Sequence, residues 1–224
     1  MKSLCTITFL VITIIILACA CNKDEAVGLI TDADGNVYHK VSVGNQVWMK
    51  ENLKTTKFRN GNKVPLVPGF TAWMRLTTPG YCWYDNDPAS NKETFGALYN
   101  WHAVNSGKLC PAGWHVPTAE EWITLIEYLG GENVAGGKLK EEGTLHWDNP
   151  NTGATNELGF DAVAGGARGI DGSFIMIGQR CSWWTSTVLN DWSAKSVNID
   201  HYETRAKVIS YGKTNGMSVR CIMD

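Results

Sequence analysis

The stretch Val116-Pro117-Thr118-Ala119-Glu120-Glu121-Trp122 begins the clearest secondary-structure element of the chain. Thr118 and Glu121 have the spacing of a capping box, in which the two side chains satisfy free backbone N–H groups at a helix start. Apolar residues then follow at the spacing of one helical face: Trp122, Leu125, Ile126 and Leu129. This pattern predicts a helix over 119–129, which Gly130-Gly131 ends.

Weaker patterns on either side of this helix predict the rest of the fold. Apolar residues recur at helical spacing from Phe95 to Val104 and indicate a second helix, and a short helix is expected near 135–141. Asp34-Gly35-Asn36 and Gly44-Asn45 lie between alternating runs and indicate two β-hairpins. Six later segments have strand patterns: 159–164, 173–177, 182–188, 194–199, 205–211 and 217–222. Two main helices followed by strands predict an α+β fold with short antiparallel strands and long loops.

The composition is that of a globular domain that binds no nucleic acid. The 224 residues carry 20 Lys and Arg against 22 Asp and Glu, a net charge of −2, so no basic field is present to neutralise phosphates. Ten tryptophans and 23 glycines indicate a loop-rich fold held by large aromatic side chains. From 28 to 224 no Pro/Gly-rich break or charge block divides the chain, so one domain is expected there.

The first 27 residues have the pattern of an export signal and a tether. An apolar run from Leu4 to Ala18 follows Lys2, as in secretory signal peptides, with an uncleaved membrane anchor as the alternative. The end of segment 1–21 resembles a bacterial lipobox, which implies lipid attachment at Cys19, with Cys21 as the alternative. Residues 22–27 form a polar tether similar to the export tags of surface lipoproteins in the Bacteroidetes. This resemblance implies an outer-membrane lipoprotein of the bacterial cell envelope and favours its surface-exposed face.

Four cysteines belong to the expected domain: Cys82, Cys110, Cys181 and Cys221. In an oxidising compartment they allow three two-bridge pairings, and their spacing does not choose among these. None belongs to a Cys-x-x-Cys pair, so the sequence indicates neither a zinc knuckle nor a thioredoxin-type redox site.

A series of motifs in a fixed order covers about residues 28–224: Asp34–Tyr38, Val43–Lys54, Phe95–Trp101, Leu109–Thr118 with Glu121-Trp122, Trp183–Ser186 and Ser218–Cys221. The series resembles the Fibrobacter succinogenes major paralogous domain family. This resemblance implies a C-type-lectin-like fold similar to that of the formylglycine-generating, sulfatase-modifying enzymes. It also implies a disulfide between Cys110 and Cys221. Cys181 departs from the family pattern, which leaves the second pair, Cys82 and Cys181, without support.

The sequence lacks the motifs of the enzyme classes that the resemblance suggests. Formylglycine-generating enzymes need two late cysteines a few residues apart to hold copper, whereas Cys181 and Cys221 are 40 residues apart. No Walker loop, His-Glu-x-x-His or Gly-x-Ser-x-Gly motif occurs, and the histidines show no i, i+4 pairing. His115 is expected to be a packed residue with one bonded ring nitrogen. We therefore expect no catalytic residues, no cofactor and no transition-metal site.

Calcium is the one metal that the acidic loops suggest, because it prefers several oxygen ligands. Asp32-x-Asp34-Gly35-Asn36 begins like a calcium loop, but Val43 stands where the later Glu is needed, so a hairpin turn is the favoured interpretation. Asp85 and Asp87 are the remaining candidates, either for a structural Ca²⁺ or for a solvated turn.

The tryptophans give the best indication of a ligand site. Trp183 and Trp184 are consecutive, and on a strand they point to opposite faces, so one is expected in the core and the other partly exposed. We predict that Trp184, Asp191, Trp192 and Arg205 bind a ligand, with indole faces stacking on a sugar ring. The favoured function is a non-enzymatic, lipid-anchored envelope protein that binds a glycan or a protein partner through its loops. The alternatives are an enzyme related to the sulfatase-modifying proteins and a structural component of a surface assembly.

Overall fold

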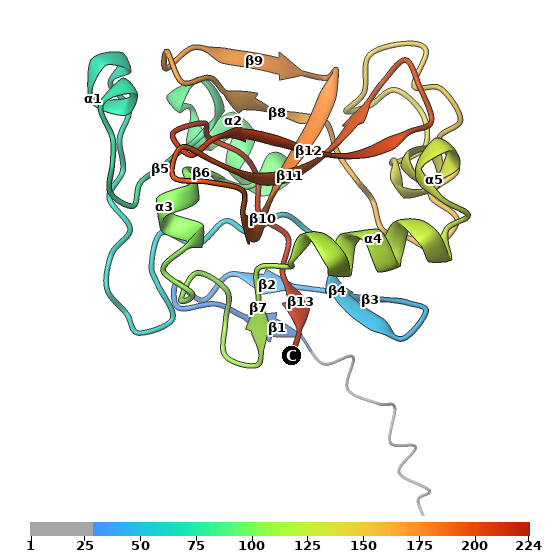
Figure 1. Ribbon diagram of the computed structural model, residues 1–224, viewed down its shortest axis with the longest axis horizontal. Coiled ribbons are helices and arrows are strands. Elements are labelled where there is room, and N and C mark those ends of the chain that lie inside the picture. Colours follow the sequence, from blue (N-terminus) through green and yellow to red (C-terminus); the bar gives the residue numbers. More distant parts are fainter. Residues whose placement is uncertain (1–28) are drawn as a thin grey trace, which may run out of the picture.

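Residues 29–224 are described by a computed structural model, in which strands outnumber helices (Figure 1). The predicted export signal, the lipobox cysteines Cys19 and Cys21 and the tether at 22–27 lie outside these residues. The helical segments are short: α1 Phe70–Met74, η1 Tyr84–Asn86, α2 Pro88–Phe95, α3 Trp101–Val104, α4 Ala119–Tyr128 and α5 Glu132–Leu139. Together with the sheets they confirm the α+β class.

The largest sheet has five strands in the order β12-β11-β10-β8-β9, with bounds Ala206–Gly212, Ser193–Asp200, Arg180–Val188, Gly165–Arg168 and Phe174–Ile177. Its neighbours are antiparallel except β8 and β10, which pair in parallel at Gly166 and Cys181. Two of the expected late strands differ from the structure. Residues 159–164 form no strand, and of 217–222 only Ile222 belongs to one.

The first half of the domain, together with the C-terminal strand, forms three smaller sheets. The four-stranded sheet has the order β3-β4-β13-β7, with bounds Lys40–Val43, Gln46–Met49, Ile222–Met223 and Trp114–His115. The two-stranded sheets join β1 Ile30–Thr31 to β2 Val37–Tyr38, and β5 Tyr81–Cys82 to β6 Leu98–Tyr99. Both predicted hairpins are confirmed, because β1 pairs with β2 around Asp34-Gly35-Asn36 and β3 pairs with β4 around Gly44-Asn45.

Helix α4 begins at the predicted residue and lies between the five-stranded sheet and the β3–β4 hairpin (Figure 1). The Glu121 backbone N–H donates to Thr118 Oγ1 at 3.1 Å, and the Thr118 N–H donates to Glu121 Oε2 at 2.7 Å, which completes the capping box. Trp122 lies in the middle of this layer, 4.6 Å from Trp48 and 5.1 Å from Trp183 between ring centroids. The apolar stripe of α4 is thus buried on both sides.

The helix predicted over Phe95–Val104 is wrong. Helix α2 ends at Phe95, and β6 and α3 replace the expected helix. Gly96 has a φ of 72°, and a Cβ at this position would lie 2.8 Å from the Leu53 carbonyl oxygen. The chain therefore turns at a position that only glycine can occupy without strain. Helix α3 then begins where the Asn100 side chain accepts from the Ala103 N–H at 3.1 Å. The short helix expected near 135–141 is present as α5, shifted toward the N-terminus.

All ten tryptophans lie in the described part of the chain, and nine of them are buried. Trp183 and Trp184 are both fully buried, so the expectation that one is partly exposed is wrong. They do point to opposite faces of β10, but each face of the sheet is covered: Trp183 packs in the core beneath α4, and Trp184 packs with Tyr99 and Trp101 in the other core. Strand alternation predicts exposure only where one face of a sheet meets solvent.

The disulfide between Cys110 and Cys221 is confirmed, with the two Cα atoms 6.1 Å apart. It joins the loop before β7 to the residue before β13. The second pair does not form, because Cys82 and Cys181 are free and lie in different core clusters. Burial raises the pKa of the Cys82 thiol to about 12 and raises that of Cys181 further, so both behave as apolar core residues.

Candidate functional site

The four residues predicted to bind a ligand do not form one site. Trp184 is fully buried and its Nε1 donates to the Tyr99 carbonyl oxygen at 2.8 Å, so no indole face is left for a ligand. Asp191 and Trp192 lie in the turn before β11, whereas Arg205 lies before β12 and pairs with Glu132 at 2.6 Å. These two places lie at opposite ends of strand β11, so the length of the strand lies between them. Only Asp191 and Trp192 remain together.

Trp192 is the one exposed tryptophan, with 84% of its surface accessible. Its turn is fixed from within, because Asn190 Oδ1 accepts from the backbone N–H groups of Trp192 and Ser193, each at 2.9 Å. Lys213 fixes the turn from outside: its N–H donates to the Trp192 carbonyl at 2.9 Å and its Nζ donates to the Asp191 carbonyl at 3.1 Å. The indole is therefore displayed on an ordered turn.

Apolar side chains surround this turn at one end of the five-stranded sheet. Val188 and Leu189 are exposed just before Trp192, and Ile170 in the β8–β9 turn is 58% exposed. A Cβ on Gly212 would lie 3.5 Å from Ile170 and 4.0 Å from the Trp192 carbonyl, so the two turns are neighbours. An indole with an apolar rim and the free Asp191 carboxylate beside it can stack on a flat apolar ligand face and accept a hydrogen bond.

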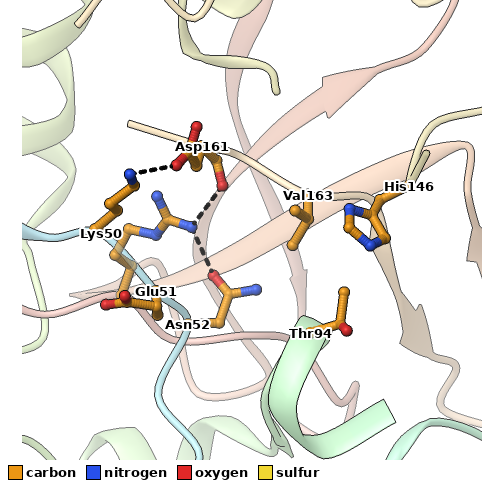
Figure 2. Close-up of a pocket in the computed structure, with 8 residues that line it drawn as sticks. Lys50, Glu51, Asn52, Thr94, His146, Asp161 and Val163 are labelled. Atoms are coloured by element: carbon orange, nitrogen blue, oxygen red, sulfur yellow. Dashed lines mark hydrogen bonds and ion pairs between the residues drawn. The ribbon is translucent and has the colours of Figure 1, made fainter. Parts of the chain in front are cut away.

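A separate pocket of about 220 Å³ lies where the loop after β4 meets the loop before β8 (Figure 2). Lys50 pairs with the Asp161 carboxylate at 2.6 Å on one side, and Thr94 and His146 lie on the other side (Figure 2). His146 Nδ1 lies 2.8 Å from the carboxylate of Glu141, which does not line the pocket. The charged groups at the rim thus have partners within the protein.

This pocket was not predicted, and it has no assembled acid–base site. Glu141 orients His146 as a carboxylate orients a general base, and Thr94 is the hydroxyl nearest in the lining. Within residues 29–224, however, Thr94 makes no side-chain hydrogen bond to His146. A nucleophile needs such contact with its base, so the pocket shows no nucleophilic arrangement.

One wall of the pocket is formed by Arg220, whose side chain is buried in the core. Arg220 is 1% exposed, and its guanidinium lies 4.3 Å from the Phe160 ring and 5.3 Å from Trp183. Its Nη2 donates to Asn52 Oδ1 at 3.2 Å, and Trp183 Nε1 donates to the same oxygen at 2.8 Å. Burial lowers the pKa of Arg220 to about 10. Asn52, Trp183 and Arg220 come from three of the motifs that carry the family resemblance, and here their role is structural.

Two of the aspartates considered as calcium ligands, Asp87 and Asp32, are hydrogen-bonded within the protein. Asp87 is the N-cap of α2 and accepts from the Ala89 and Ser90 N–H groups at 3.0 and 3.2 Å, which lowers its pKa together with the Ser90 hydroxyl. Asp85 has a φ of 50° in the preceding turn. Asp32 bonds within its own hairpin, including Tyr38 at 2.6 Å. In the described part of the chain no group of three or more His, Cys, Asp or Glu residues can hold a metal ion.

His115 is partly exposed and uses both ring nitrogens, not one as predicted. Nδ1 contacts Asp224 at 2.7 Å and Nε2 contacts Glu121 at 2.9 Å, so the ring joins the end of β13 to the start of α4. Burial alone lowers the pKa of His115, but the hydrogen bonds to Asp224 and Glu121 outweigh it and raise the pKa above its usual value.

Stability is therefore expected to fall as the pH rises past the pKa of His115. The protonated ring is favoured in the folded state, so its contribution is complete below the unfolded-state pKa of 6.5 and is lost as the pH rises through the higher folded-state pKa. His115→Gln should flatten this part of the curve of Tm against pH. His102→Gln is the control, because burial and Lys213 lower the pKa of His102. The effect of His102 on the pH dependence of stability is therefore confined to pH values below 6.5. Parallel curves for wild type and His115→Gln above pH 6.5 would contradict the assignment.

The fold and its surface define a disulfide-linked α+β domain with an aromatic interior and an ordered, exposed loop. The chain belongs to the Fibrobacter succinogenes major domain family, whose sequence profile matches residues 41–223. Comparisons with curated proteins and with solved structures give no match. Among residues 29–224, no helix combines the length and apolar character needed to cross a membrane.

Proposed function

We propose that the protein is a non-enzymatic binding module that recognises a glycan through the turn that carries Trp192. One observation carries the proposal: of ten tryptophans, Trp192 alone is exposed, and hydrogen bonds from Asn190 and Lys213 hold its turn in place. A fixed indole stacks on the apolar face of a sugar at little cost in conformational entropy, and Asp191 supplies a hydrogen-bond acceptor.

We also propose that the domain has a C-type-lectin-like fold. The bridge between Cys110 and the residue before the final strand supports it, as do the long loops around the five-stranded sheet. We also propose that the domain is attached to the outer membrane of the bacterial cell envelope, at the surface-exposed face, through a lipid on Cys19 or Cys21. Detergent partitioning of Cys19→Ala and Cys21→Ala variants tests this attachment.

Trp192→Ala is expected to weaken glycan binding by about tenfold or more, because a central stacking aromatic dominates such a contact. Binding is measured on a glycan array with the full chain and then titrated with the best ligand. Tyr128→Ala is the matched control, since Tyr128 is an exposed aromatic on α4, far from the turn in sequence.

The Trp192→Ala substitution should leave the unfolding temperature unchanged, because the indole is exposed and packs on little. A loss of binding without a loss of stability then identifies a ligand contact. If wild type binds no glycan, or if Trp192→Ala binds as wild type does, the proposed site is wrong.

A further inference from the structure

Strand β12 is a free edge of the five-stranded sheet. It pairs with β11 from Ala206 to Gly212, and on its other side the sheet ends. An edge strand leaves alternate backbone N–H and C=O groups without sheet partners, and a second chain can pair with them.

Several features that normally protect an edge are absent from β12. Its seven residues contain no proline and no positive φ. Its single charge, Lys207, is directed to Glu203 and lies 3.8 Å from Asp200. The opposite edge, β9, is different, because it has only four residues and Met176 interrupts it with a φ of 64°. Short length and a left-handed residue both hinder pairing, so β12 is the edge suited to accept a strand.

A groove of about 380 Å³ runs beside β12, between this strand and the ends of α4 and α5. In Figure 1 these two helices lie at one side of the sheet, next to the end of β12 where Ala206 begins. The groove has apolar walls from both sides: Ile123, Ile126, Ala206 and Val208. Alternate apolar side chains of an added strand would enter it, because successive side chains of a strand point to opposite faces.

The rim of the groove is acidic. Glu127 lies at the groove and makes no ion pair within residues 29–224, and neither does Glu120, two turns earlier on the same face of α4. Glu132 is paired with Arg205, and Lys138 is paired with Glu157. The unpaired charge that lines the groove is therefore that of Glu127, which favours a basic residue in the part of the occupant that faces it.

We propose that this edge binds an extended segment of a partner protein, which adds to the sheet beside β12 and carries apolar side chains and one basic side chain on the face that meets the groove. The backbone of the segment pairs with β12. On the face that meets the groove, its apolar residues contact Ile123 and Val208 and its basic residue approaches Glu127. The groove lies at the Ala206 end of β12, whereas the turn that carries Trp192 lies beside the opposite end of the strand, at Gly212.

The test uses a fluorescein-labelled heptapeptide whose groove-facing alternate residues are three valines and one lysine, with threonine between them, titrated against the full chain by fluorescence anisotropy. We expect saturable binding, and loss of it for the same peptide N-methylated along its backbone, which removes every N–H donor and keeps the side chains. Glu127→Lys should weaken binding by about tenfold, whereas Ile175→Lys on β9 should not change it.

Absence of saturable binding, equal binding of the N-methylated peptide, or equal weakening by Ile175→Lys overturns the proposal. A dimer in sedimentation that Val208→Lys dissociates also overturns it, because a second copy then occupies the edge. Trp192→Ala should bind the peptide as wild type does, so failure of the glycan site and failure of this site are distinguished.

Discussion

Replacing Arg168 with methionine is expected to lower the free energy of unfolding by about 3–5 kcal/mol. Arg168 is fully buried, and its guanidinium donates to the carbonyl oxygens of Val67, Pro68 and Gly172 at 2.7, 2.8 and 2.8 Å. Methionine fills part of the same volume but leaves the Val67 and Gly172 carbonyls without a side-chain donor, and each buried orphan costs about 1 kcal/mol or more. The Pro68 carbonyl keeps only the hydrogen bond from Asn86 Nδ2 at 3.2 Å. Denaturant unfolding of wild type and variant measures the difference.

The matched control is Arg205→Met. Arg205 is exposed and its ion pair with Glu132 is a surface pair, so its removal should change stability by about 0.5 kcal/mol or less. Arg168→Lys separates charge from geometry, because lysine keeps the charge but lacks the planar fork that reaches all three carbonyls. The free energy of unfolding of Arg168→Lys should lie between those of Arg168→Met and wild type. A loss below about 1 kcal/mol for Arg168→Met would contradict this role.

Arg168 is one of three buried cations that organise long loops. Lys140 Nζ donates to the carbonyls of Thr152, Asp200 and Glu203 at 2.8, 3.2 and 3.0 Å, and Arg220 bonds the carbonyl of Phe160. Within residues 29–224 none of the three forms an ion pair. Instead, each cation donates to carbonyls of loop segments, Lys140 also to that of Asp200 at the end of β11, and packs against aromatic rings. The fold thus uses buried cations where regular secondary structure is sparse.

The sequence predicts those parts of the fold that local interactions determine. Helix α4 is such a part, because its capping box and apolar stripe both lie within 118–129. The segment 95–104 is not: its apolar spacing is helical, but Gly96 must pass close to Leu53, more than 40 residues earlier in the chain. That contact is tertiary and has no local signal. The same limit applies to Arg168 and Lys140, since lysine and arginine are ordinarily exposed and nothing near them in sequence marks them as buried.

The candidate site was predictable in part. The sequence places Asp191 and Trp192 between two predicted strands, and both are exposed in the structure. Trp184 was wrongly included because alternation along β10 cannot reveal that both faces of the sheet are covered. Arg205 was included through nearness in sequence, although strand β11 places it at the other end of the sheet. Asn190 was missed, yet an Asn two residues before an exposed aromatic is the signal of an ordered turn.

Removing the disulfide with the double substitution Cys110→Ser and Cys221→Ser is expected to lower the free energy of unfolding by about 4 kcal/mol. The bridge spans 111 residues, and this loop contains α4, α5 and the whole five-stranded sheet. Closing so long a loop removes much conformational entropy from the unfolded chain, which is the main source of its stabilisation in the chain-entropy description. For a domain of this size the loss corresponds to a fall in Tm of about 10 °C.

Two controls separate the bridge from simple loss of packing around sulfur. Cys82→Ser and Cys181→Ser alter free, buried thiols, so each should lower the Tm by less than the double variant does. The difference in Tm between each control and wild type should be the same with and without reductant. Reductant should lower the Tm of wild type and of both controls toward that of the double variant, and should leave the double variant itself unchanged. A double variant as stable as wild type, or one whose Tm still responds to reductant, would show that the bridge does not stabilise the domain. Because both cysteines of the bridge are buried in the native domain, reduction should require partial unfolding and should accelerate with denaturant.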